Sequence, residues 1–394
     1  MSWRIGRGVN SRIPSMLCLC ALVLVLLAGR AWGEMPWAFV VMGDPRPGAP
    51  GDPEAVGFRA DLDAMKASII DNAGDTGLPV PELIIICGDI DEVATTELVI
   101  QQWEADNNYS LPFFPVIGNH DTAQADLAAI EEIYDLHDAE GVWNLDPGPA
   151  GTEKLTYSFD YKNAHFAVLN CYWDGADHAV DDISRPNIVP NLRSWLADDL
   201  AATELDFKFV CVHAPAWPFG RHVGESLDHD PENRDRFWAL LGQYGVEACF
   251  VGHTHKVSTF QWLGNWGNIG RGRWPAEDEG RYTSRIIPDA IGTWQIDSGA
   301  ARGVATSDYD RAFVHVIVDA TQMQFRVWVD DDGWRVPANC VDMHGRPNVY
   351  DSAVPPSPCP PFVCCGVPGW ISSLGLALGM VLLSRFGGYR RRAV

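Results

Sequence analysis

Five short apolar segments, each followed directly by glycine or histidine and other polar residues, constrain the fold of this chain most strongly. Runs of this length without polar alternation are typical of strands that are covered on both faces. Amphipathic helices are expected between them, over Phe58 to Asn72, from Pro190 onward, and after the capping pair Asp230 and Pro231. The five segments are Trp37 to Met42, Leu83 to Cys87, Phe113 to Ile117, Phe207 to Val212 and Val246 to Val251.

A second group of strands is expected from segments that alternate in the antiparallel style. They cover Thr156 to Asp160, His165 to Asn170, Ala312 to Val318 and Phe325 to Val329. Together the two groups predict an α/β fold of two stacked mixed β-sheets flanked by helices, a four-layer α/β/β/α sandwich. No break in composition divides residues 34–350, which we expect to form one domain.

The first 33 residues have the features of a secretory signal peptide. Arg4, Arg7 and Arg12 precede an apolar stretch from Pro14 to Gly29, and the small residues of the Ala31–Gly33 triplet are typical of a cleavage site. We therefore expect the body of the protein outside the cytoplasm, in the periplasm, on the cell surface or secreted.

The C-terminal end predicts a second targeting element. Residues 351–365 form a spacer rich in proline and cysteine, and residues 366–394 join a hydrophobic span to the cluster Arg390 to Arg392. This arrangement resembles the bacterial PEP-CTERM sorting segments, although the PEP triplet itself is absent. A permanent membrane anchor is the alternative, and both place the body on the side of the membrane away from the cytoplasm.

The charge of the chain argues against a nucleic-acid partner. It has 29 basic and 52 acidic residues, a formal net charge of −23, and phosphate backbones are bound by basic surfaces. A small-molecule partner and bound cations suit this composition better. The oligomeric state is not predicted.

Residue types that bind metal ions follow the five apolar segments. In α/β sheets, ligands bind beyond the carboxyl ends of the strands, and glycines at 43, 88, 118 and 252 allow a sharp exit of the backbone there. Carboxylates, an amide and imidazoles suit Mn, Fe or Zn better than a metal selected by thiolates. The candidate ligands are Asp44, Asp89, Asn119, His213, His253 and His255.

The ordered series GD, GD, GNHD, H and GHTH resembles the calcineurin-like metallophosphoesterases, which include purple acid phosphatases and cyclic-nucleotide phosphodiesterases. The resemblance runs from Trp37 to Ala300. It implies a metal-dependent hydrolase of phosphate mono- or diesters, in which a hydroxide bridging two metal ions attacks phosphorus. The signal-like N-terminus adds the expectation that this enzyme is exported. The resemblance also implies that Asp89 bridges the ions, that Asp44 and His255 bind the first, and that Asn119, His213 and His253 bind the second.

The resemblance further implies roles beside the metals. His120 would protonate the leaving group or stabilise its charge, and Asp121 would orient His120. Apart from the resemblance, the loop after His213 makes His222, together with Arg221, a candidate for binding the substrate.

One residue departs from the family pattern. The first motif is usually D-x-H with a histidine ligand, and here it is Asp44-Pro45-Arg46. Arginine has no lone pair to offer a metal ion. Three interpretations follow: water or Glu92 takes the vacant position, Arg46 binds the substrate phosphate, or the first position is weak. The last leads to an alternative function, a non-catalytic or mononuclear metal-binding surface protein on the same fold.

Overall fold

The computed structural model describes residues 36–176, 183–261, 269–270, 292–320, 322–330 and 334–335. All of them belong to one compact unit of the chain. The predicted signal peptide, the C-terminal spacer and the C-terminal span lie outside the described residues and stay predictions. Within the described residues, no helix combines the length and apolar character needed to cross a bilayer.

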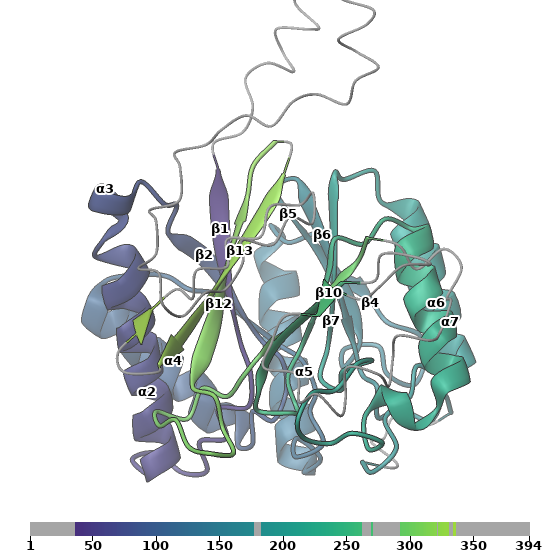
Figure 1. Cartoon of the computed structure of the whole chain (residues 1–394), viewed down its shortest axis with the longest axis horizontal. Coiled ribbons are helices and arrows are strands. Elements are labelled where there is room, and N and C mark those ends of the chain that lie inside the picture. The colour runs from purple at the N-terminus through teal and green to yellow at the C-terminus, as the bar shows by residue number, and fades with distance from the viewer. Residues whose placement is uncertain are drawn as a thin grey trace, which may run out of the picture. The chain divides into compact units, whose positions relative to one another are not determined.

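Two sheets form the centre of this unit (Figure 1). The first has the strand order β14-β13-β12-β1-β2-β3 and the second has the order β10-β9-β11-β8-β7-β6-β5-β4. The first sheet contains β1 (Trp37–Met42), β2 (Pro81–Ile86), β3 (Phe113–Pro115), β12 (Ala312–Val318), β13 (Met323–Asp330) and β14 (Trp334–Arg335). The second contains β4 (Asp146–Pro147), β5 (Tyr157–Tyr161), β6 (Ala164–Leu169), β7 (Phe207–Val212), β8 (Ala248–Val251), β9 (Val257–Gln261), β10 (Ile269–Gly270) and β11 (Trp294–Ser298).

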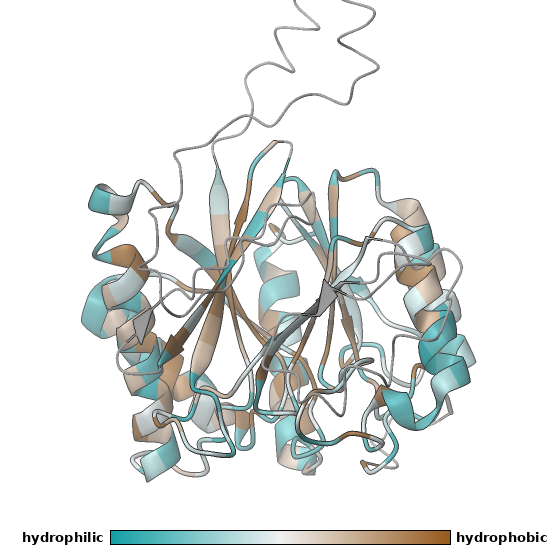
Figure 2. Ribbon diagram, in the orientation of Figure 1, coloured by the Kyte–Doolittle hydropathy of each residue, from teal (hydrophilic) through white to brown (hydrophobic). Residues whose placement is uncertain are grey.

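Helices cover the outer faces of the two sheets, so the predicted four-layer sandwich is confirmed. Figure 1 shows α2 (Pro53–Met65) and α4 (Val93–Asn107) on one side, and α6 (Pro190–Ala202) and α7 (Pro231–Gln243) on the other. The π-helical turn Lys66–Ile70 and α3 (Ala73–Thr76) follow α2, α5 (Gln124–Glu140) follows β3, and a 3₁₀ turn spans Leu227–His229. The strands are the most hydrophobic part of the ribbon, whereas the helices alternate apolar and polar faces (Figure 2).

The core between the sheets is mainly aromatic. Phe39 of β1 packs edge-on against Phe166, Phe209 and Phe250 from three strands of the opposite sheet, with ring centroids 5.2 to 5.7 Å apart. All four rings are fully buried. Such edge-to-face contacts add about 1 kcal/mol each to the burial of apolar area. This packing fixes the separation and the alignment of the two sheets.

The antiparallel segments do not form a sheet of their own, contrary to their grouping in the sequence. β12 pairs antiparallel with β1, so β12 and β13 extend the first sheet. β6 pairs parallel with β7, so β5 and β6 extend the second. The first sheet is therefore parallel from β1 to β3 and antiparallel from β1 to β14, whereas the second is parallel at its centre, from β11 to β6, and antiparallel toward both edges. The carboxyl ends of β1, β2, β7 and β8 consequently face one another across the sandwich.

Candidate metal centre

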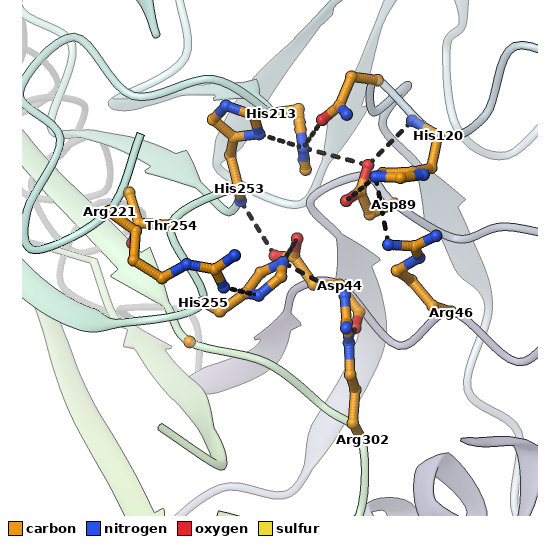
Figure 3. Close-up of polar contacts among 12 residues, drawn as sticks. Asp44, Arg46, Asp89, His120, His213, Arg221, His253, Thr254, His255 and Arg302 are labelled. Atoms are coloured by element: carbon orange, nitrogen blue, oxygen red, sulfur yellow. Dashed lines mark hydrogen bonds and ion pairs between the residues drawn. The ribbon is translucent and has the colours of Figure 1, made fainter. Parts of the chain in front are cut away.

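The loops that follow β1, β2, β3, β7 and β8 meet at one edge of the sandwich (Figure 3). Backbone hydrogen bonds tie them together: Asp44 N donates to Gly88 O at 3.1 Å, and Gly252 N donates to His213 O at 3.0 Å. The same five loops carry the candidate ligands. Side chains from distant parts of the chain therefore come together at this edge.

The sharp exit from the strands depends on the ligands as much as on the glycines. Asp44 and Asp89 have φ of 51°, and His253 and His255 have φ of 70° and 59°. A left-handed conformation costs a non-glycine residue on the order of 1–3 kcal/mol and is concentrated at functional sites. Of the four glycines singled out from the sequence, only Gly88 has a positive φ.

Gly118 has a different role, because it allows the loops after β2 and β3 to approach each other closely. A Cβ atom at this position would lie 2.1 Å from the backbone nitrogen of Asp89 and 2.5 Å from its Oδ1. No real Cβ approaches backbone so closely, so any side chain here would push the loops after β2 and β3 apart. The glycine therefore brings Asn119 within reach of Asp89.

Four side chains converge on what we call the second position. His213 Nε2 lies 3.3 Å from Asp89 Oδ1, 3.2 Å from Asn119 Oδ1 and 3.2 Å from His253 Nδ1. Ligands bound at about 2.1 Å to one ion stand roughly 3.0–3.4 Å from one another, so this spacing suits a shared metal ion. His213 and Asp89 are almost completely buried.

The first position lies between Asp44, Asp89 and His255. Asp44 Oδ1 is 3.0 Å from His255 Nε2, while Asp44 Oδ2 accepts a hydrogen bond from His253 N at 3.0 Å. Asp44 Oδ1 is buried and has no aligned hydrogen-bond donor among the described residues. Donor atoms of Asp44, Asp89 and His213 all lie within 4.8 Å of one another. A buried carboxylate oxygen left in this state fits a cation.

The electrostatics of the pocket also favour a cation. Burial opposes the ionised form of Asp44, but His255, His213 and Arg302 outweigh it and hold the pKa of this carboxyl well below its usual range. Burial lowers the pKa of His213, yet Asp89 and Asp44 raise it by more. The negative field that draws a proton to His213 draws a metal ion in the same way.

His120 and Arg46 lie side by side at the rim of the site (Figure 3). His120 N donates to Asp89 Oδ1 at 3.1 Å, and its Nε2 is 3.2 Å from Nη1 of Arg46. Nε and Nη2 of Arg46 both donate to Asp91 Oδ2, at 3.0 and 2.8 Å. Burial, and after it the Arg46 charge, lower the pKa of His120 although Asp89 and Asp91 act to raise it.

Asp121 contacts the loop backbone. Its Oδ2 accepts from Gly118 N and its Oδ1 from Asp91 N, both at 2.7 Å. Burial, reinforced by the Asp89 charge, raises the pKa of Asp121 to about 7. Among the described residues, Asp121 bonds to these backbone amides and the His120 ring contacts Arg46, Asp89 and Asp91. Any orientation that Asp121 gives to His120 therefore passes through the backbone between them.

The remaining residues named from the sequence have distinct surroundings. The His222 ring stacks on the His253 ring with centroids 4.1 Å apart, and its Nδ1 is 3.1 Å from Glu225 Oε2. Glu92 is exposed, and its carboxylate accepts a hydrogen bond from Thr95 Oγ1 at 3.1 Å. That contact directs Glu92 to the first turn of α4, so it gives no support to Glu92 as a replacement ligand.

The sequence reasoning missed Arg302 and Tyr309. Arg302 Nε donates to Asp44 O at 2.7 Å, and its Nη2 is 3.2 Å from His255 Nε2. The Tyr309 ring lies 4.8 Å from the His255 ring. Arg302 follows closely on the end of β11 at Ser298. That position was the available signal.

The structure is thus an α/β protein of two stacked sheets that gathers Asp, Asn and His side chains, residue types that bind metal ions, at its strand ends. The model of the calcineurin-like phosphoesterase family matches residues 39–257, more than half of the chain. The chain therefore belongs to the calcineurin-like phosphoesterase family, as the motif series predicted.

Two curated relatives are similar to parts of the chain. A probable glycerophosphodiester phosphodiesterase of Arcobacter nitrofigilis is 26% identical over 190 residues, which cover 47% of this chain and 60% of that protein. Human tartrate-resistant acid phosphatase type 5 is 25% identical over 192 residues, 45% of this chain and 54% of that protein. The matches thus span little more than half the length of these relatives.

Two solved structures are similar to this fold at low sequence identity. The structure of PhoD has a TM-score of 0.49 and 13% identity, and covers 81% of this chain and 72% of its own. A purple acid phosphatase from yellow lupin, Lupinus luteus, has a TM-score of 0.46 and 14% identity, and the match covers 77% of this chain and 53% of that protein.

Proposed function

We propose that this chain is a metal-dependent phosphoesterase that hydrolyses a phosphate mono- or diester. The observation that carries the proposal is the convergence of Asp44, Asp89 and His213, whose donor atoms lie within 4.8 Å of one another in a buried pocket. The two curated relatives carry the names of a phosphodiesterase and a phosphatase, which leaves both classes of ester open.

The donor set suits two ions of Mn, Fe or Zn, one at each position. Asp89 lies between the positions, Asn119, His213 and His253 belong to the second, and Asp44 and His255 belong to the first. Ions held there would supply an activated water and neutralise the phosphoryl oxygens. Because the body of the protein is strongly acidic, these ions would also provide the positive potential that an anionic substrate requires.

His120 and Arg46 are the groups placed to act on the ester itself. His120 stands at the mouth of the pocket and is partly exposed, with its ring 3.9 Å from Asp89 Oδ2. It is proposed to pass a proton to the leaving oxygen or to stabilise its charge. Arg46 is held by Asp91 with Nη1 beside His120, where a guanidinium would bind a phosphoryl oxygen in a charge-assisted hydrogen bond.

The site of action is proposed to be outside the cytoplasm, on the basis of the signal-like residues 1–33 and the C-terminal residues 366–394. Membrane contact through that C-terminal segment, transient or permanent, belongs to the same proposal. Cell fractionation and N-terminal sequencing of the mature protein would test it, since an uncleaved cytoplasmic chain would contradict both elements.

Hydrolysis of chromogenic esters tests the activity. Purified protein supplied with Mn²⁺, Fe²⁺ or Zn²⁺ should hydrolyse p-nitrophenyl phosphate or bis(p-nitrophenyl) phosphate, and chelation should stop the reaction. His120→Ala should reduce kcat about a hundredfold or more, the usual range for loss of a general acid. Asp89→Asn should lose both metal and activity, whereas His229→Ala, in the 3₁₀ turn, is a control.

The same assay decides between this proposal and the non-catalytic alternative. A folded protein that binds metal and hydrolyses neither ester with any of the three ions would favour a metal-binding surface protein on this fold. Activity that persists in Asp89→Asn would place the reaction elsewhere in the molecule.

A further inference from the structure

Metal-binding histidines differ in what faces the ring nitrogen that does not bind the metal. This second nitrogen normally donates its proton to a carbonyl or carboxylate, which leaves the other nitrogen with a lone pair for the ion. His213 follows this pattern, because its Nδ1 lies 2.6 Å from the carbonyl oxygen of Cys87. That carbonyl can only accept, so Nδ1 keeps its proton and Nε2 is available at the second position.

His255 has the opposite surroundings. Its Nδ1 contacts Nη1 of Arg221, and its Nε2 is 3.2 Å from Nη2 of Arg302 (Figure 3). A guanidinium can donate hydrogen bonds but cannot accept them, and it stays protonated in proteins. A neutral imidazole has one lone pair, so at most one of the two arginines can be satisfied by it.

An ion at the first position would compete directly with these arginines. To bind the ion, His255 must offer the lone pair of Nε2 and carry its proton on Nδ1. That proton would then point at Nη1 of Arg221, so that two hydrogen-bond donors would face each other. Arg302 would also have to leave Nε2, although its Nε is fixed by the carbonyl of Asp44 at 2.7 Å.

The two arginines are held in place by Tyr309. The guanidinium carbons of Arg221 and Arg302 lie 5.4 and 5.0 Å from the centroid of its ring, within the range of cation–π attraction. Tyr309 is in turn 4.8 Å from the His255 ring. Arg221, Arg302 and Tyr309 therefore form one cluster around His255, which we call the arginine bracket.

Two further features disfavour an ion at the first position. Arg46 stands where the family motif has a histidine, so the first position is one protein ligand short. Each guanidinium also brings a positive charge within a few ångströms of the ion, and such repulsion is weakly screened in a buried pocket. The second position has neither disadvantage, since its four donors face one another without an arginine among them.

We propose that the arginine bracket makes the first position much weaker than the second, so that the chain retains one ion tightly and exchanges the other. This inference rests on the proposed function only in taking both positions as metal sites. Asp44 Oδ1, buried without an aligned donor among the described residues, keeps the first position able to take a cation. The affinity there is set by Arg221 and Arg302.

Metal counting tests the proposal without measuring activity. Protein dialysed extensively without chelator should retain about one ion per chain by elemental analysis. Calorimetric titration with Mn²⁺ should then show a separate, weaker second step. Electron paramagnetic resonance should report an isolated Mn²⁺ ion after the first equivalent and a coupled pair only when the second is added in excess.

Two variants of Arg221 test whether this residue weakens the first position. Arg221→Gln removes the charge and offers an amide oxygen, directly or through water, to a proton on Nδ1. It should lower the Kd of the second titration step, in which an ion fills the first position, by about tenfold. This is the lower end of the effects that outer-shell partners have on metal affinity. Arg221→Lys keeps a cation that only donates, and its second step should match that of the unmodified protein.

Two results would overturn the proposal: two ions retained equally tightly by the unmodified protein, or a second step that is the same in Arg221→Gln, Arg221→Lys and the unmodified chain. The first comparison needs no variant, so it stands even where the glutamine variant does not fold. Failure to hydrolyse phosphate esters would count against the proposed function alone, since these measurements follow only the bound metal.

Discussion

His165 provides a quantitative test of the electrostatics of this fold, away from the metal centre. Its ring lies between two carboxylates, with Nδ1 2.7 Å from Asp160 Oδ1 and Nε2 2.9 Å from Asp199 Oδ2. The side chain is only 7% exposed. Burial alone lowers its pKa, but the hydrogen bonds and charges of the two carboxylates raise it to about 9 from the ordinary 6.5.

The size of the effect follows from this shift. A difference of about 2.5 units at 1.36 kcal/mol per unit amounts to roughly 3 kcal/mol of folding free energy. Because the pKa is raised in the folded state, this stabilisation is fully present below pH 6.5. It is lost progressively as the pH rises through 9, where the folded protein gives up the proton that the unfolded chain has already released.

Urea unfolding of the protein and of the His165→Gln variant, both with chelator present, would measure this contribution of His165 to the free energy of unfolding. Glutamine cannot take up the proton. The loss of unfolding free energy in the variant should therefore be about 3 kcal/mol larger at pH 6 than at pH 9.5. Any packing cost of the substitution is independent of pH and cancels between the two measurements. A stability difference that is the same at both pH values would refute the assignment of a charged His165 between the two carboxylates.

Three further predictions concern the metal centre. Gly118→Ala should reduce metal content and activity strongly, because its Cβ would lie 2.1 Å from the Asp89 backbone, whereas Gly74→Ala, with open space around it, should leave metal content unchanged on elemental analysis. Arg46→Ala should raise KM about tenfold and keep the bound metal, and a loss of metal would contradict its role in binding phosphate. Chelation should lower the thermal midpoint by several degrees, because an ion at a hundred times its Kd contributes about 2.7 kcal/mol. Mn²⁺ should restore the midpoint, and Asp89→Asn should show no such shift.

The sequence points to the residues that gather at the site because each follows its own strand. Asp44, Asp89, Asn119, His213 and His253 stand directly after apolar segments, and parallel strands bring such positions to one edge of the sheet. The signal is local for each residue, and only the convergence is a property of the fold. The same local logic predicted the cap at Asp230, whose side chain accepts from Glu232 N and Asn233 N.

Residues that reach the site through tertiary structure could not be predicted in this way. Arg302 contacts Asp44 across 258 positions of sequence, and its place shortly after β11 is the only local indication of that contact. Asp91 has no signal of its own in the sequence, because it reaches the site as the ion-pair partner of Arg46, a residue that departs from the family pattern. The helix expected over 58–72 begins instead at Pro53, where Asp52 caps it by accepting from Ala55 N. The Asp-Pro pair there is the same signal that was recognised at Asp230.

The left-handed backbone at Asp44, Asp89, His253 and His255 bears on any attempt to engineer this protein for heat resistance. Glycine adopts that conformation without steric cost, so glycine at these positions would relieve the unfavourable torsions, but Asp44→Gly would also leave the buried His253 N and the His255 ring without their carboxylate. Thermal screening alone would weigh these two opposing effects and would not detect the loss of the side chains that are proposed to hold the ions. Libraries built on this sequence should keep these four positions constant and look for robustness in the outer helices.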